Sequence, residues 1–265
     1  MTESATSSGT VARITLLLRV LAEADGDCSL SEIAERMKLP ASTTHRLLNL
    51  LLEQGFVERG DANRTYRAGM EFLRLGGLVV SRSELTEVAQ SFMRAVVDAC
   101  DETVMLSVFV PRTLVCMITK VIYGSHPLRY EAQLYEPTSL AWGATGRGIL
   151  AFLPAAVIDA VLAKEEPSPG TGKKMGKTSS IKTELALIAE QGYAHSRGQK
   201  VQGAVGLSAP VFNVGGVIGA LCMTIPESRY VDSKQPRLVR QLTEQAARFS
   251  SALGYRSASK TSARR

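Results

Sequence analysis

The sequence predicts an α+β protein of two domains, a small helical domain followed by a larger one that contains an antiparallel sheet. Three observations predict it. Apolar residues recur at helical spacing up to residue 54, two segments rich in β-branched residues follow residue 101, and two more follow residue 204. The length of 265 residues suits two domains of ordinary size, and 45% hydrophobic residues provide for their cores.

The composition limits the class of protein. The sequence has no run of 18 apolar residues, so it predicts no transmembrane span. Residues 1–9 are rich in Ser and Thr, are expected to be disordered, and lack a signal-peptide pattern, so we expect a cytoplasmic protein. The four cysteines lack the spacing of zinc ligands or of a disulfide framework, and we expect buried thiols, no metal and no cofactor.

The first domain is expected to span residues 10–69 and to begin with a helix near Val11. This helix should end at Asp25-Gly26-Asp27, where apolar periodicity stops. Its buried side should pack beneath the two helices that follow. The apolar residues at helical spacing are Ile14, Leu17, Leu18 and Leu21.

Residues 30–69 predict a winged helix-turn-helix, which is two short helices joined by a tight turn and followed by a two-stranded ribbon. Ser31 is expected to cap the first of these helices, and Pro40 is expected to open the second. The second helix should end at Gln54-Gly55. The stripe that it should bury consists of Thr44, Leu47, Leu48, Leu51 and Leu52.

The opposite face of this second helix is polar and carries groups that bond phosphates or base edges. The ribbon has expected strands at residues 56–59 and 64–67 about a polar turn at 60–63. Its arginines suit a wing that lies beside a phosphate backbone. We therefore predict a DNA-binding domain whose contact residues are Ser42, Thr43, Thr44, His45, Arg46, Asn49, Arg59, Arg64 and Arg67.

Net charge does not carry this prediction. The chain has a formal charge of +6, yet residues 1–70 hold eight Lys and Arg against nine Asp and Glu. The basic excess lies in residues 167–183 and in a tail at 256–265, which is expected to be disordered. The DNA prediction depends instead on the placement of side chains within residues 42–67.

Residues 70–84 are expected to form a linker helix between the domains. Its apolar character on all sides favours burial against another surface, such as a second subunit, although Gly76-Gly77 weakens its middle. The alternative is that it is one more core helix. A second amphipathic helix is expected to follow from Leu85.

The larger domain is expected to span residues 85–255. Strands are predicted at residues 103–110 and 113–122, with Pro111-Arg112 as a hairpin turn, and at 205–212 and 217–224. Helices are predicted at residues 141–152, 155–163, 183–191 and 238–253. Strands with helices between and after them predict a sheet with helices packed on it.

The glycine-rich segment 143–148 of the larger domain predicts a helix start whose free N–H groups favour an anion such as a carboxylate. Arg129 or Arg197 would be its charge-assisted partner. Tyr123 and Tyr130 favour an aromatic compound, so our hypothesis is a small organic acid. The alternative is that these glycines serve close packing of the helix on the sheet.

Four passages in this order resemble the IclR family of bacterial transcription regulators, from about Thr10 to Tyr255. LSEIAERMKLPASTTHRLLNLLLEQGFVER is similar to the family's helix-turn-helix and first wing strand. DETVMLSVF is similar to its first sheet strand, with Asp101 where glycine is usual. SLAWGATGRGILAFLP is similar to the passage entering the effector pocket, and QGAVGLSAPVFNVGGVIGALCMTIPESR to the closing hairpin.

The resemblance implies a regulator that binds a palindromic operator as a dimer, with tetramers common, and a GAF-like C-terminal domain that binds a small metabolite. It also implies effector contacts by position, although Arg197 stands where the family often has an acid. Together with the residues of the anion hypothesis, the expected ligand-binding set is Arg129, Tyr130, Ala144, Thr145, Gly146, Ser196, Arg197, Ala204, Gly206, Cys222 and Thr224.

Two other classes of protein remain as alternatives. An enzyme would use Cys116, Cys222 or His195, but no nucleophile elbow accompanies them, and residues 171–178 lack the glycine spacing of a phosphate-binding loop. We therefore expect neither an enzyme nor a catalytic residue. A module whose winged domain binds protein would carry apolar anchors where the second helix has Ser42 and Arg46.

Overall fold

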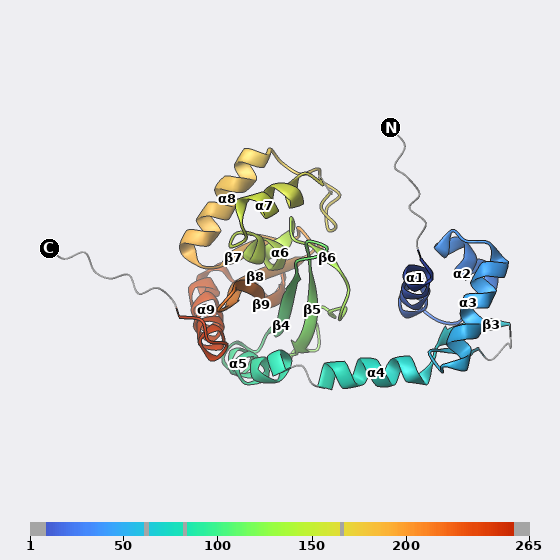
Figure 1. Ribbon diagram of the computed structural model, residues 1–265. Coiled ribbons are helices and arrows are strands. Elements are labelled where there is room, and N and C mark those ends of the chain that lie inside the picture. Colours follow the sequence, from blue (N-terminus) through green and yellow to red (C-terminus); the bar gives the residue numbers. More distant parts are fainter. Residues whose placement is uncertain (1–8, 61–63, 82–83, 165–166, 257–265) are drawn as a thin grey trace. The chain divides into compact units, whose positions relative to one another are not determined.

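The structure is a computed structural model that describes residues 9–60, 64–81, 84–164 and 167–256 (Figure 1). Three expectations lie outside the described residues, namely the disorder of residues 1–8, the disorder of residues 257–265, and the wing turn at 61–63. The chain divides into two compact units, one ending at Ser83 and the other beginning at Glu84. Each unit has its own hydrophobic core.

The first unit is the predicted winged helix-turn-helix. Its helices are α1 (Thr10–Ala22), α2 (Leu30–Met37) and α3 (Ala41–Glu53). Its three-stranded antiparallel sheet has the order β1-β3-β2 and contains β1 (Cys28–Ser29), β2 (Val57–Arg59) and β3 (Thr65–Ala68). The three helices meet in a core whose fully buried side chains include Leu17, Ile33, Leu47 and Leu48.

Helix α2 is capped by Ser29, whereas we expected Ser31. The Ser29 hydroxyl accepts a hydrogen bond from the Glu32 N–H at 3.3 Å, and the Glu32 carboxylate accepts the Ser29 N–H at 2.7 Å. This reciprocal pair is a capping box, which satisfies two N–H groups that the helix start would leave unpaired. Pro40 stands directly before α3, as predicted.

Helix α4 (Met70–Ser81) runs through Gly76 and Gly77 without a break. Its apolar side chains are open to solvent in the single chain, with exposed fractions of 66% for Met70, 60% for Leu73 and 73% for Val79. So many exposed apolar side chains on one helix are typical of a surface that a partner covers.

The second unit contains a six-stranded antiparallel sheet with the order β6-β5-β4-β9-β8-β7. Its strands are β4 (Thr103–Val110), β5 (Val115–Ile122), β6 (Thr138–Ser139), β7 (Ala194–Arg197), β8 (Ala204–Asn213) and β9 (Gly216–Pro226). The central neighbours β4 and β9 lie far apart in the sequence and pair Met105 with Cys222.

Helices cover both faces of this sheet (Figure 1). One face packs against α5 (Glu84–Cys100) and α9 (Gln235–Ala252), which follows a short 3-10 turn at Asp232–Lys234. The other face packs against α6 (Gly143–Leu150), α7 (Ala155–Leu162) and α8 (Thr178–Gln191). Side chains alternate along a strand, so Val104 and Leu106 of β4 join the first layer while Met105 joins the second.

The predicted α+β architecture is confirmed, with three differences in detail. Strand β5 begins at Val115, because Leu114 has a left-handed backbone (φ 56°) that completes the turn after β4. Helix α8 begins at Thr178, five residues before its predicted start at 183. Strands β6 and β7 were not predicted, since one has two residues and the other mixes polar with apolar side chains.

Within the described ranges, none of the helices combines the length and the apolar character that crossing a bilayer requires.

Candidate functional site

Helix α3 has one buried face and one face open to solvent. On the open face, Ser42, His45 and Arg46 are exposed, and Thr43 and Asn49 are half-buried. The buried face consists of Thr44, Leu47, Leu48 and Leu51. The core therefore fixes the helix while five of its six predicted contact residues face outward, with hydrogen-bonding groups that suit phosphates and base edges.

Thr44 is the exception and corrects our prediction. Its side chain is fully buried, and its hydroxyl donates a hydrogen bond to the Pro40 carbonyl oxygen at 3.2 Å. Threonine hydroxyls commonly bond the carbonyl four residues earlier in a helix. Thr44 is therefore part of the core and is not available to DNA.

The three predicted arginines of the wing remain at the surface, each in a different setting. The Arg59 guanidinium lies over the Tyr66 ring, 5.4 Å from its centroid. Arg67 pairs with Glu58 of the neighbouring strand at 3.7 Å, and Arg64 is exposed directly before β3. Paired residues of an antiparallel ribbon share a face and successive residues alternate, so Arg59 lies on the Tyr66 face and Arg67 on the Glu58 face.

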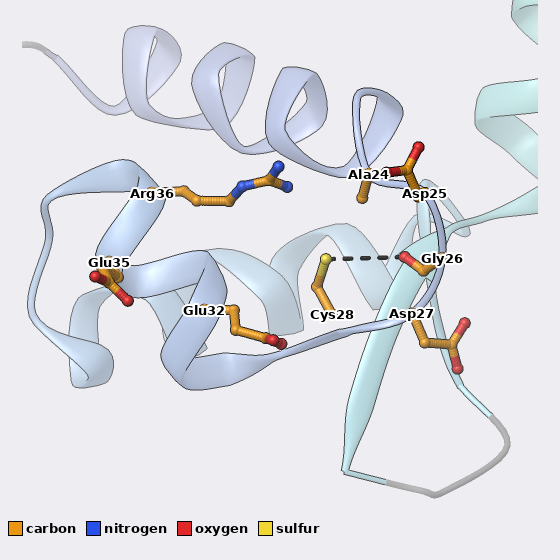
Figure 2. Close-up of a pocket in the computed structure, with 8 residues that line it drawn as sticks. All are labelled: Ala24, Asp25, Gly26, Asp27, Cys28, Glu32, Glu35 and Arg36. Atoms are coloured by element: carbon orange, nitrogen blue, oxygen red, sulfur yellow. Dashed lines mark hydrogen bonds between the residues drawn. The ribbon is translucent and has the colours of Figure 1, made fainter.

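A shallow hollow between the end of α1 and α2 is acidic (Figure 2). It is lined in part by Asp25, Asp27, Glu32, Glu35 and Arg36. Two of these carboxylates have structural partners, because Asp27 accepts a hydrogen bond from the Thr65 hydroxyl and Glu32 belongs to the capping box. Its negative charge disfavours phosphate, and the described residues contain no group of three His, Cys, Asp or Glu that suits a metal ion. We assign no ligand to this hollow.

The second unit contains a cavity of about 180 Å³ between the sheet and the N-terminus of α6. This volume lies below the roughly 300–1,000 Å³ of pockets that hold drug-sized ligands, so the cavity suits a small molecule. Its walls come from β4, β5, the segment 130–138, the start of α6, β7 with the loop that follows, β8 and β9. The apolar part of the wall consists of Met105, Ile118, Ala132, Ala144, Val201 and Ala204.

Seven of the eleven predicted ligand residues line this cavity. They are Tyr130, Ala144, Thr145, Ser196, Ala204, Gly206 and Thr224. The strand register brings three of them together, because Ser196 of β7 pairs with Gly206 of β8, which pairs in turn with Thr224 of β9. The four that do not line it are Arg129, Gly146, Arg197 and Cys222.

Neither arginine of the anion hypothesis reaches the cavity. The Arg129 guanidinium lies over the Tyr123 ring, 4.3 Å from its centroid. Arg197 pairs with Asp232 and lies 4.9 Å from the centroid of the Tyr230 ring. Successive side chains of a strand point to opposite faces, so Arg197 faces away from the cavity that its neighbour Ser196 lines.

The N-terminus of α6 is not the free anion site that we expected. The Gly143 N–H donates to Gln199 Oε1 at 3.1 Å, and the Ala144 N–H donates to Ser196 Oγ at 2.8 Å. Gly146 packs on backbone, since a Cβ there would lie 2.7 Å from the carbonyl oxygens of the two residues 139 and 140. The glycines thus serve close packing, and neutral side chains already occupy the first two N–H groups.

Lys200 supplies the cation that the two arginines do not. It lines the cavity, and its side chain follows the first turn of α6, because a Cβ added to Gly143 would lie 3.2 Å from Lys200 Cβ. Burial raises the pKa of the Cys222 thiol to about 12, while a hydrogen bond with Thr145 and the Lys200 charge both oppose this rise. Lys200 is the one cation among the described residues that line the cavity.

Six polar residues of the cavity were missed by sequence reasoning. They are Glu131, Gln133, Glu136, Thr138, Gln199 and Lys200. Thr138 belongs to the two-residue strand β6, and the other five lie in irregular segments, at residues 130–137 and 198–203, where no period of 2 or 3.6 assigns a side chain to a face. The one available signal was the position of Lys200 shortly after the predicted ligand residues 196 and 197.

Comparison with known proteins finds a matching family model for each of the two units. Residues 77–251 match the model described as bacterial transcriptional regulator IclR C-terminal, and residues 10–61 match the IclR helix-turn-helix domain. The HTH-type transcriptional regulator KipR of Bacillus subtilis is 27% identical, with 86% of this chain and 90% of that protein covered. The regulator XynR of Escherichia coli is 26% identical, with 92% and 97% covered.

Solved structures share the fold over nearly the whole chain. An IclR transcriptional regulator from Alicyclobacillus acidocaldarius has a TM-score of 0.81 at 22% identity, covering 93% of this chain and 99% of that one. An IclR homologue from Microbacterium hydrocarbonoxydans, complexed with 4-hydroxybenzoate, has a TM-score of 0.78 at 24% identity, with 93% and 99% covered.

Proposed function

The chain belongs to the IclR family of DNA-binding bacterial transcriptional regulators, and from this premise we propose how its two units act. The exposed face of α3 reads operator DNA in the major groove, and the wing arginines contact phosphates. The cavity beside α6 binds a small organic acid, which changes the affinity for the operator. Such a regulator acts in the cytoplasm, where the DNA is.

The observation that carries the DNA proposal is the division of α3 into a buried and an open face. Arg46 and Ser42 stand exposed on the open side, while Leu47 and Leu48 of the same helix are buried. An arginine on a recognition helix bonds guanine edges, and a serine hydroxyl bonds bases or phosphates. A surface meant for a protein partner would carry apolar anchors at these positions.

The effector proposal is supported by the chemistry of the cavity wall. An apolar wall, a lysine and the Thr145 and Thr224 side chains form a site that suits a carboxylate on a compact carbon skeleton. The Microbacterium hydrocarbonoxydans homologue was crystallised with 4-hydroxybenzoate, which is such an acid. The Cys222 thiol is buried and does not line the cavity, so it offers no nucleophile to a bound molecule, and we propose a binding site and not a catalytic one.

We further propose that the chain acts as a dimer on a palindromic operator. The exposed apolar side chains of α4, such as Leu73 and Val79, support self-association because water is a poor partner for them. A twofold-symmetric protein requires half-sites that are related by the same symmetry.

The test is selection of duplexes from a random pool by the full chain, followed by fluorescence anisotropy on a recovered duplex. We expect recovered sequences with inverted-repeat symmetry and a binding constant that falls log-linearly with salt, because bound phosphates release counterions. Recovery of no common sequence, together with binding that is insensitive to salt, would contradict the proposal. Calorimetric titration of the full chain with benzoate and 4-hydroxybenzoate separately tests the proposal that the cavity beside α6 binds a small organic acid.

A further inference from the structure

The charged groups of the cavity lie on different sides of it. Lys200 follows β7, at one edge of the sheet, and its side chain lies along the first turn of α6. Glu136 lies toward the opposite edge, directly after Tyr135, whose N–H donates to the Ile118 carbonyl oxygen of β5 at 2.8 Å. The sheet order puts β4, β9 and β8 between these two edge segments.

The segment that carries Glu136, residues 130–137, is held across the cavity by hydrogen bonds at two points. At its start, the Tyr130 hydroxyl donates to the Gln202 carbonyl oxygen at 3.1 Å, and near its end the Tyr135 N–H bonds β5. These contacts keep an acidic rim over a cavity whose floor is apolar. In the described part of the chain, neither Lys200 nor Glu136 makes an ion pair.

The lining of the cavity also contains Glu131, at the start of the segment that carries Glu136, so its described residues supply one cation and two carboxylates. Lys200 and Glu136, charges of opposite sign at separate places in one small cavity, define a ligand with two different ends. The first two N–H groups of α6 are already bonded to Ser196 and Gln199, and Lys200 is the one cation in this described lining, so Lys200 supplies the positive charge for a carboxylate. A second carboxylate at the far end would face Glu136, and like charges in a partly enclosed site repel. A hydroxyl or ammonium group there would donate to the Glu136 oxygens.

Resting on the proposed function, we propose that the effector has one carboxylate, held at Lys200, and at its other end a hydrogen-bond donor that meets Glu136. The class is therefore a hydroxy acid or an amino acid whose two groups are separated by a short apolar body. A dicarboxylate of the same length binds more weakly because its second carboxylate meets the like charge of Glu136.

Calorimetry on the full chain with two matched series tests this. The aliphatic series is butyrate, 4-hydroxybutyrate, 4-aminobutyrate and succinate, and the aromatic series is benzoate, 4-hydroxybenzoate, 4-(aminomethyl)benzoate and terephthalate. In at least one series we expect the donor-bearing acid to bind roughly twofold to fivefold more tightly than the dicarboxylate, the range for exposed charge pairs. Glu136→Gln should remove most of this preference, and Glu190→Gln, at an exposed glutamate of α8, should leave it intact.

The outcomes separate the two proposals. Equal or tighter binding of the dicarboxylate, or a preference that Glu136→Gln leaves unchanged, overturns the two-ended ligand while the acid-binding cavity stands. Failure of every acid in both series, with circular dichroism showing an intact fold, overturns the proposed effector class and this inference with it.

Discussion

The open face of α3 and the cavity beside α6 are built in opposite ways. The α3 face belongs to one helix, and each of its polar side chains reaches solvent without help from the others. The cavity is assembled from strands, a helix start and irregular segments, and its polar groups bond one another, as Ser196 and Gln199 bond α6. Substitutions on the α3 face should therefore act locally, whereas substitutions in the cavity should also act through neighbours.

The largest expected effect lies on the buried side of α3. Leu48→Ala removes a fully buried side chain and should lower the unfolding free energy of the first unit by about 2–5 kcal/mol. Urea denaturation followed by circular dichroism measures this. Leu50 of the same helix is 45% exposed, so Leu50→Ala is the matched control and should change stability much less. Equal losses in the two variants would mean that the faces of α3 are not divided as described.

The next largest effect sharpens the description of the cavity. Lys200→Met keeps an unbranched apolar stem and removes the charge, so binding of whichever probe acid binds the wild type should weaken roughly tenfold to a hundredfold. Calorimetry gives the affinity, and Lys177→Met, at an exposed lysine directly before α8, is the control. If Lys200→Met bound the acid as tightly as the wild type, the carboxylate would have to be held elsewhere.

A smaller effect tests the start of α2. Ser29→Ala removes the capping hydroxyl and should cost about 1 kcal/mol of stability, while Ser31→Ala, at an exposed position inside the helix, should cost little. Thermal unfolding of the two variants under identical conditions decides between them. A larger loss of stability for Ser31→Ala than for Ser29→Ala would mean that Ser31 caps α2, as we expected from the sequence.

The same cap predicts a direction for the effect of pH. The backbone N–H and then the hydroxyl of Ser29 hold the pKa of Glu32 below its usual 4.5. Because the folded-state pKa is the lower one, the stabilisation is present above the unfolded value and is lost as the pH falls through the folded value. Glu32→Gln should therefore lose less stability than the wild type on acidification below pH 4.5.

The α3 face and the cavity also differ in how well the sequence predicts them. The buried stripe of α3 was predicted because the helical period determines it, and strand β4 was predicted because its segment is rich in β-branched residues. Thr44 was misassigned only by being counted on both faces of α3. The cavity was predicted in part, because the family resemblance indicated effector contacts by position, and the strand register then brings residues such as Ser196 and Gly206 together. Lys200 and Glu136 were missed because irregular backbone gives no rule for side-chain direction, and charge alone favoured Arg129 and Arg197.

The most direct test of the account is the operator affinity of Arg46→Ala, measured by fluorescence anisotropy on the selected duplex and compared with Arg248→Ala. Both substitutions remove one exposed cation, the first from α3 and the second from α9 of the other unit. The account predicts a loss of about 1–3 kcal/mol for Arg46→Ala, with an intact fold, and nearly wild-type binding for Arg248→Ala. Unchanged binding by a folded Arg46→Ala variant would contradict the assignment of α3 as the helix that reads DNA.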